Sequence, residues 1–133
     1  MNKTFMIRII LVALFTVLVI SGCRSNPILE YKDSPISSMT NKDLTIEQIK
    51  KGIVDAGVPL GWIFSDKGPG HLVGTLALRK HLAVIDIKFD TKVYSITYKD
   101  SENLNYDGAN IHAQYNNWIK NLQRRINVKL NSL

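Results

Sequence analysis

Residues 71–99 read HLVGTLALRK, HLAVIDIKFD and TKVYSITYK, and their alternation of apolar and polar side chains decides the fold. Alternation with a period of two is typical of a strand that has one buried face. It predicts strands over residues 71–79, 82–89 and 93–99. In each strand the apolar side chains share one face, as follows: Leu72, Leu76 and Leu78; Ala83, Ile85, Ile87 and Phe89; and Tyr94, Ile96 and Tyr98.

Two short turns connect these strands and predict the register of the sheet. A two-residue turn at residues 80–81 and another at residues 91–92 would each join two antiparallel strands. Both turns then place every apolar set on the same face. Neither turn contains the Asn or Gly that tight hairpins favour. The predicted pairs are Leu78 with Ala83, Leu76 with Ile85, Phe89 with Tyr94, and Ile87 with Ile96.

Helical patterns lie on either side of the strands. Thr45 and Gln48 have the spacing of a capping box, in which each side chain bonds a free backbone amide at the start of a helix. Gly57 is expected to end this helix in the left-handed conformation. A second helix is predicted over residues 111–128. The apolar stripes of the two helices are Ile46, Ile49, Ile53 and Ala56, and Ile111, Tyr115, Trp118, Leu122 and Ile126.

The order of these elements predicts an α+β fold. A further short strand is expected at residues 62–65, between the first helix and residue 71. The chain would then form a four-stranded antiparallel meander with two helices, in the order α-β-β-β-β-α. Because the sheet has one apolar face and both helices have an apolar stripe, both helices are expected to pack on that face.

The opposite face of the predicted sheet is mixed rather than apolar, as expected for a face in contact with water. Its polar side chains are Thr75, Arg79, Asp86, Lys88, Ser95, Thr97 and Lys99. We take the region around Thr75, Asp86 and Thr97 as a candidate binding surface.

A different signal occupies the N-terminus. Lys3 and Arg8 precede an apolar run, and Ile20-Ser21-Gly22-Cys23 closes it with the chain's single cysteine. A basic start, a short apolar segment and small residues before a cleavage point are typical of a secretory signal. The run is too short for a transmembrane helix, which needs about 20 apolar residues. The pattern is a lipobox, so Cys23 is expected to carry diacylglycerol and fatty-acid chains such as palmitate. An ordinary buried cysteine or an intermolecular disulfide are the alternatives.

This signal divides the chain into a signal peptide over residues 1–22, a lipidated Cys23 with a flexible tether over residues 23–41, and a periplasmic domain over residues 42–133. The tether is expected because residues 24–41 are polar and show no lasting period. Arg24 follows the cysteine where an Asp would retain the protein in the inner membrane. The outer membrane, with the domain facing the periplasm, is therefore expected, and the inner membrane is the alternative.

Composition restricts the class of partner. The formal net charge of the 133 residues is +6, and two of the positive charges, Lys3 and Arg8, lie in the predicted signal. A basic surface often indicates nucleic acid, but an exported domain held at a membrane rarely meets any, so no nucleic-acid partner is expected. The remaining candidate partners are anionic lipid headgroups, lipopolysaccharide and acidic partners. The alternative is a mildly basic surface that contacts only water.

Part of the domain resembles a known family. Residues 94–104 (YSITYKDSENL), Ile111-His112 and residues 115–118 (YNNW) are similar to small uncharacterised proteobacterial lipoproteins. The resemblance extends from about Gly61 to Ile126. It implies an envelope lipoprotein, and it implies no activity, ligand or cofactor.

The polar residues near the last strand give the remaining candidates. Residues 100–106, with His112, Tyr115 and Asn116, could grip a glycan or peptide, or could be a loop held by side chains bonded to backbone. The candidate binding residues are Thr75, Asp86, Thr97, Asp100, Asn103 and His112. Cys23 is the lipidation site. No catalytic residue and no cofactor is expected.

No metal site is expected either. His71 and His81 lie at opposite ends of the predicted hairpin, and His112 with Asp107 supplies too few ligands for zinc.

The partners expected are membrane lipid through Cys23 and an envelope protein or glycan. The sequence leaves three functions open: a non-catalytic binding or assembly module of the cell envelope, a structural subunit that pairs through the open sheet face, and a small periplasmic hydrolase.

Overall fold

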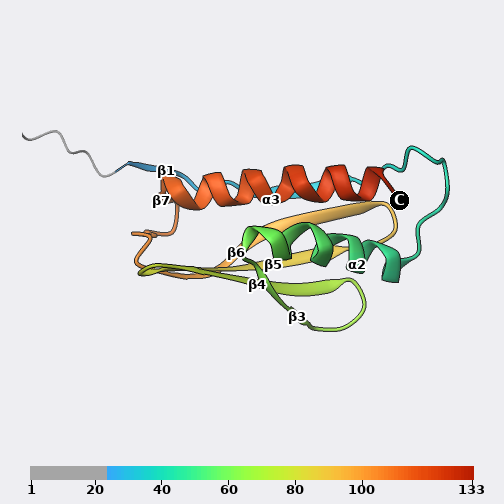
Figure 1. The fold of residues 1–133 in the computed structure, drawn as a ribbon. Helices are drawn as coiled ribbons and strands as arrows, with labels where there is room; N and C mark the ends of the chain where they lie inside the picture. The colour runs from blue at the N-terminus through green and yellow to red at the C-terminus, as the bar shows by residue number, and fades with distance from the viewer. Residues whose placement is uncertain (1–23) are drawn as a thin grey trace, which may run out of the picture.

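The computed structural model describes residues 24–133 (Figure 1). Its elements, in chain order, are β1 (Ser25–Pro27), β2 (Tyr31–Pro35), α2 (Ile46–Gly57), the 3-10 turn η1 (Val58–Leu60), β3 (Ile63–Asp66), β4 (His71–Leu78), β5 (His81–Phe89), β6 (Val93–Glu102), β7 (Asn110–His112) and α3 (Ala113–Asn131). The α+β class and the two helices are as the sequence predicts.

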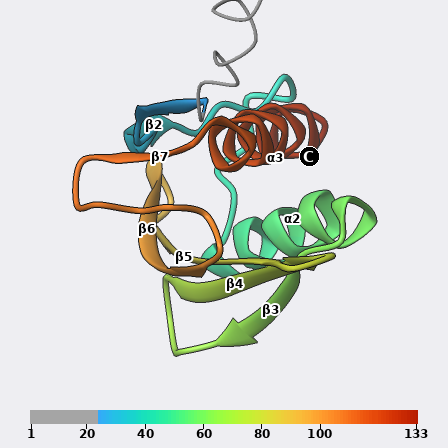
Figure 2. The ribbon, with the colours of Figure 1, turned by 90° about the vertical axis from the view of Figure 1, so that its left-hand side faces the viewer.

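The main sheet is antiparallel and has the strand order β2-β6-β5-β4-β3. Strands β3 to β6 follow one another as the predicted meander. The sheet has a fifth strand, β2, which pairs with β6 along the opposite edge. A separate two-stranded sheet joins β1 to β7. Helices α2 and α3 lie on the same side of the main sheet (Figure 2).

One hydrophobic core fills the space between the helices and the sheet. The sheet contributes buried residues such as Leu72, Ile85 and Ile96, and the helices contribute Ile49 and Leu122. The residues of both predicted helical stripes pack in or against this core, and the capping box at Thr45 is present. Ile111 does so from β7, because α3 begins at Ala113 and not at residue 111 as predicted. The core therefore occupies one face of the sheet and leaves the other face without a covering layer.

The turn between β4 and β5 corrects one predicted register. Leu78 pairs with His81 and Leu76 pairs with Ala83, so the turn is formed by residues 79–80 instead of 80–81. Arg79 has φ +56°, and a tight two-residue turn needs such a positive φ. The shift is two residues, which preserves the faces because side chains alternate with a period of two.

The turn between β5 and β6 has the predicted register. Phe89 pairs with Tyr94, and Ile87 pairs with Ile96. The carboxylate of Asp90 accepts hydrogen bonds from the backbone N–H groups of Lys92 (2.7 Å) and Val93 (2.8 Å). These two hydrogen bonds lower the pKa of Asp90. An Asp side chain thus supplies the turn stabilisation for which the sequence offers no Asn or Gly at residues 91–92.

Gly57 has a different role from the predicted left-handed cap. Its φ is −88°, and the chain continues from it into η1, which ends at Gly61 with φ +96°. A Cβ atom on Gly57 would lie 2.4 Å from the ring of Phe64. Gly57 is therefore needed for close packing against Phe64, and Gly61 is the residue that takes the left-handed conformation.

The predicted flexible tether is wrong for the segment that contains β1 and β2. Ile28 donates its N–H to Ala109 (2.9 Å), and Ile36 donates to Lys92 (2.8 Å). The partly buried apolar side chains of this segment pack against the core, and they are Ile28, Leu29, Tyr31 and Ile36. Periodicity did not reveal these strands because each is short, and because the register of β2 shifts between Tyr31 and Ser34, with Asp33 at φ +51°.

Asn116 of α3 fastens this N-terminal segment. Its Oδ1 accepts the N–H of Leu29 (2.9 Å), and its Nδ2 donates to the carbonyl of Pro27 (2.9 Å). Asn116 is the one buried polar residue among those the structure describes. Both polar atoms of the side chain bond to backbone groups of the segment between β1 and β2. These backbone groups are therefore paired with the Asn116 amide instead of with a neighbouring strand.

Replacing Asn116 with Ala is expected to lower the free energy of unfolding by about 1–3 kcal/mol, because a backbone donor and acceptor in a partly buried place lose their partner. Asn117→Ala is the matched control, since Asn117 is exposed on the same helix and should change stability by less than about 0.5 kcal/mol. Denaturant midpoints of both variants check this. Equal midpoints would mean that Asn116 does not hold the segment.

The lipobox and Cys23 lie outside the described residues. Among residues 24–133, no helix has both the length and the apolar character needed to cross a bilayer. Signal cleavage and lipidation at Cys23 remain predictions from the sequence.

Candidate functional site

The six candidate binding residues fall into two groups. Thr75, Asp86, Thr97 and Asp100 lie on β4, β5 and β6, with side chains on the uncovered face, which we call the outer sheet face. Asn103 and His112 lie at one end of the molecule, near the turn between β4 and β5. The structure therefore does not gather all six into one site.

Asp86 occupies the middle of the outer sheet face. It pairs with Val73 on β4 and with Thr97 on β6. Its Oδ1 lies 2.6 Å from Nε2 of His71, and its Oδ2 lies 3.7 Å from Nζ of Lys99. The carboxylate of Asp86, 18% exposed, is thus held between two basic side chains.

The contact between His71 and Asp86 does not follow from the predicted register. The predicted register would have placed Thr75 opposite Asp86. In the structure His71 pairs with Lys88, which lies two residues from Asp86 on the same face. The turn that sets this register has Arg79 at a positive φ, which an Arg in the sequence does not indicate.

An open hollow of about 480 Å³ adjoins Thr97 on the outer sheet face. Its lining combines hydroxyls, amino groups, carboxylates and a little apolar surface. The lining residues are Lys32, Asp33, Gly70, Lys88, Phe89, Asp90, Val93, Ser95 and Thr97. A lining of both charge signs with hydroxyls suits a polar ligand with hydrogen-bonding groups along its length.

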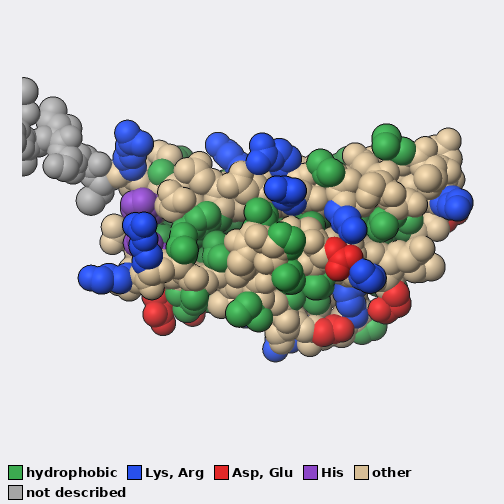
Figure 3. Space-filling model, viewed as in Figure 1, with side chains coloured by type: hydrophobic (Ala, Val, Ile, Leu, Met, Phe, Trp, Pro, Cys, Tyr) green, Lys and Arg blue, Asp and Glu red, His purple; other side chains and the backbone are tan. Residues whose placement is uncertain are grey.

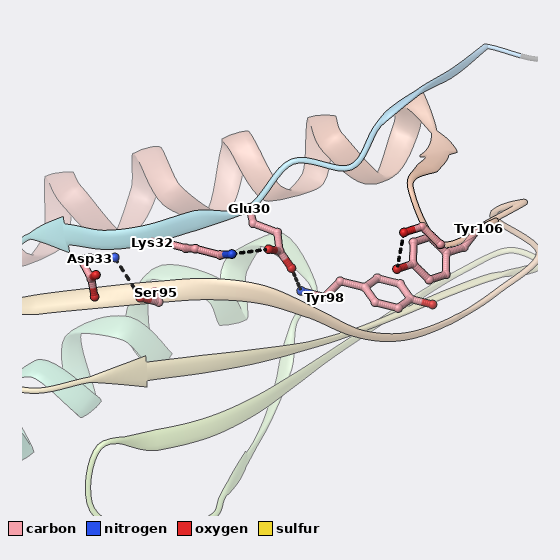
Figure 4. A network of polar contacts seen from close by, with 7 residues as sticks. Glu30, Lys32, Asp33, Ser95, Tyr98 and Tyr106 are labelled. Carbon is pink, nitrogen blue, oxygen red and sulfur yellow. Dashed lines mark hydrogen bonds and ion pairs between the residues drawn. The ribbon is translucent and has the colours of Figure 1, made fainter.

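Edge strand β2 forms one wall of this hollow (Figure 4). The N–H of Asp33 donates to Oγ of Ser95 (2.9 Å), and Glu30 accepts the N–H of Tyr98 (3.1 Å). Nζ of Lys32, whose side chain is 71% exposed, lies 3.4 Å from the carboxylate of Glu30. Lys32 and Asp33 could not be predicted as lining residues, because the sequence pattern predicts a tether over residues 24–41.

Asn103 belongs to a set of contacts that hold a turn. Its Nδ2 donates to the carbonyl of Lys80 (2.6 Å), and its own carbonyl lies 2.8 Å from Nδ1 of His81. The ring of His81 stacks on that of His112, with centroids 6.0 Å apart. Nδ1 of His112 accepts the N–H of Gln114 (3.1 Å) and so caps α3. These groups already have partners, which favours the structural interpretation of this loop.

Replacing Asn103 with Ala is expected to lower the free energy of unfolding by about 1–2 kcal/mol, through loss of the bond to Lys80 and through strain at φ +57°. Asn103→Gly separates the two causes, because Gly tolerates the positive φ and should lose less. Thermal or denaturant midpoints measure both. An unchanged midpoint in Asn103→Ala would contradict the structural role of Asn103 and would make this loop a candidate binding site again.

The rings of three tyrosines, Tyr98, Tyr106 and Tyr115, contact one another beside the loop that contains Asn103. The rings of Tyr98 and Tyr106 have centroids 4.0 Å apart, and Tyr98 meets Tyr115 edge to face. The hydroxyl of Tyr115 is buried and has no hydrogen-bond partner among the described residues. Burial raises the pKa of Tyr115, and the nearby carboxylate of Glu30 raises it further. Tyr115 therefore stays a neutral phenol and serves as a packing residue.

Within residues 24–133, no group of three His, Cys, Asp or Glu side chains is arranged to hold a metal ion. His71 and His81 are at opposite ends of the β4–β5 hairpin, as the sequence predicts. Asp107 accepts hydrogen bonds from the backbone N–H groups of Ala109 and Asn110, which lower the pKa of Asp107. Its carboxylate is thus used in a turn.

The chain was compared with protein-family models, with curated proteins and with solved structures, and no match was found.

Proposed function

We propose that this chain is a lipid-anchored envelope protein whose outer sheet face is a non-catalytic binding surface for an envelope protein or glycan. The lipobox supports the anchor, and Arg24 after Cys23 favours the outer membrane, with the domain in the periplasm. The family resemblance of residues 94–118 also supports this proposal, because it implies a lipoprotein of the cell envelope.

The observation that carries the binding role is the hollow beside Thr97 on the uncovered face. Both helices lie on the other side of the sheet (Figure 2). The hollow presents Lys88 and the hydroxyl of Thr97, beside Asp90 and Ser95, whose side chains already accept backbone N–H groups. Charged groups of both signs and hydroxyls can bond to backbone amides of a peptide or to sugar hydroxyls, and no chemical step is needed for that role.

Crosslinking in living cells tests the binding surface. A photoreactive amino acid placed at Lys88, in the hollow, is expected to give discrete adducts with an envelope protein or with glycan strands. The matched position is Gln48, exposed on α2, which should give none. Lys88→Glu should abolish adducts formed from a crosslinker at Val93, whereas Lys67→Glu, an exposed lysine outside the hollow, should leave them.

The opposite pattern would overturn the binding role. Adducts from Gln48 with none from Lys88 would place the contact surface on the helices. Absence of adducts from both positions, with the protein present in the envelope, would remove the outer sheet face as a binding surface.

A further inference from the structure

Helix α3 differs from α2 in the balance of its charges. Its sequence contains Lys120, Arg124, Arg125 and Lys129 and no Asp or Glu. On α2, Lys50 pairs with Asp66 and Lys51 pairs with Asp55. Among the described residues, Lys120, Arg124 and Arg125 have no carboxylate within 4 Å, and only Lys129 approaches one, at 3.8 Å.

These unpaired cations share the outward side of α3. Residues three and four positions apart lie on one side of a helix. Lys120, Arg124 and Arg125 are exposed, as is Val128, with 63% of its surface accessible. The opposite side of the helix is buried in the core. Figure 3 shows Lys and Arg side chains gathered along α3, with few acidic side chains near them.

The start of α3 lies beside the point where the anchor would join. The N–H of Ala113, the first residue of α3, donates to the carbonyl of Arg24 (2.8 Å). Arg24 is the covalent neighbour of Cys23, and successive Cα atoms are about 3.8 Å apart. Ser25–Pro27 is already paired with β7. The chain therefore has no flexible length that would lift the domain away from lipid on Cys23.

We propose that the outward side of α3 lies on the membrane surface and that Lys120, Arg124 and Arg125 bind phosphate-bearing anionic lipid headgroups. This inference rests on the proposed lipid anchor at Cys23. A helix of 19 residues is about 28 Å long, so all three cations come within reach of the bilayer surface when the helix lies parallel to it. Basic side chains near an anionic surface are attracted by the phosphate charges.

This orientation has a consequence for the binding surface. Figure 2 shows α3 on one side of the molecule and β3 and β4 on the opposite side. With α3 on the bilayer, the part of the outer sheet face that β3 and β4 form is directed away from the membrane. Strand β2, which forms one wall of the hollow, lies near the level of α3, at the side of the molecule (Figure 2).

Thiol accessibility in vesicles tests the orientation. Because Cys23 is the single cysteine, Val128→Cys gives the lipidated protein one free thiol on α3. Ile63→Cys, at a residue 74% exposed on β3, is the control on the other side. Each lipidated variant is inserted into phosphatidylcholine vesicles with or without phosphatidylglycerol. In phosphatidylglycerol vesicles we expect a bulky maleimide to react about tenfold more slowly with Val128→Cys than with Ile63→Cys.

Charge controls separate headgroup binding from simple crowding. The difference should vanish in phosphatidylcholine alone and in about 1 M salt, where the Debye length falls to about 3 Å. The triple change K120Q, R124Q and R125Q should also remove it. The same loss of charge elsewhere, in K42Q, K67Q and K92Q, should leave it intact.

The outcomes that contradict the inference are distinct from failure of the anchor. Equal labelling of the two thiols in phosphatidylglycerol vesicles, with the protein floating with the vesicles, would overturn the orientation and leave the anchor standing. Protection that is the same in neutral and anionic vesicles would exclude headgroup charge as its cause. A protein that does not float with the vesicles would defeat the anchor and this inference together.

Discussion

Replacing Ile85 with Asp is expected to unfold the domain. Ile85 has no exposed surface and lies on the core face of β5, opposite Gly74 and Tyr98. An unpaired carboxylate placed there costs several kcal/mol, which is a large part of the about 5–15 kcal/mol that holds a typical domain together. Circular dichroism and denaturant titration of a form beginning at Arg24 should show loss of the cooperative transition.

The matched control places the same carboxylate on the outer sheet face. Thr75→Asp should lower the free energy of unfolding by less than about 1 kcal/mol, as changes at solvated positions usually do. Thr97 is less suitable, because it lies directly opposite Asp86, where a second carboxylate would be repelled. A loss in Thr75→Asp as large as that in Ile85→Asp would mean that the two faces are assigned wrongly.

Replacing Cys23 with Ala is expected to abolish membrane attachment. Alanine has no thiol to carry diacylglycerol, so the precursor should keep its signal and incorporate no fatty-acid label. One lipid chain contributes about 0.8 kcal/mol per buried methylene, and stable anchoring needs more than one chain. Loss of all the lipid chains should therefore release the protein from this mode of membrane attachment. Metabolic labelling with a fatty-acid analogue and fractionation of envelopes measure this.

Ser21→Ala is the matched control for the signal. It retains a small side chain two residues before Cys23 and should be cleaved and labelled like the natural chain. Fatty-acid label that persists in Cys23→Ala would end the lipoprotein interpretation.

The meander could be predicted because its signals are local. Alternation within β4, β5 and β6 gave the faces, and the faces survive even the two-residue error in register at Arg79. The capping box at Thr45 needs only residues three apart, and the structure contains it. In each case the residues that determine the structure are close together in the sequence.

The N-terminal segment could not be predicted because its signals are distant. Leu29 is held by Asn116, 87 residues further along the chain. β1 and β2 are short, and neither alternates long enough to give a period. Only the tertiary fold shows that β2 completes the sheet and supplies Lys32 and Asp33 to the hollow.

The candidate site was predicted in part. Asp86 and Thr97 are neighbours on the outer sheet face, as alternation implied. Asn103 and His112 looked like binding residues because they are polar and lie in a loop, and the structure uses them to hold a turn and cap a helix. Sequence alone does not show whether a polar side chain already has a backbone partner. The presence of such a partner decides whether the side chain holds the loop or is available to bind a ligand.

Intact-mass analysis of the natural protein extracted from cell envelopes shows whether the chain is lipid-anchored. We expect a chain that begins at Cys23 and carries a diacylglyceryl group with its fatty acids. A soluble chain that begins at Met1, or one with an unmodified Cys23, would contradict this expectation.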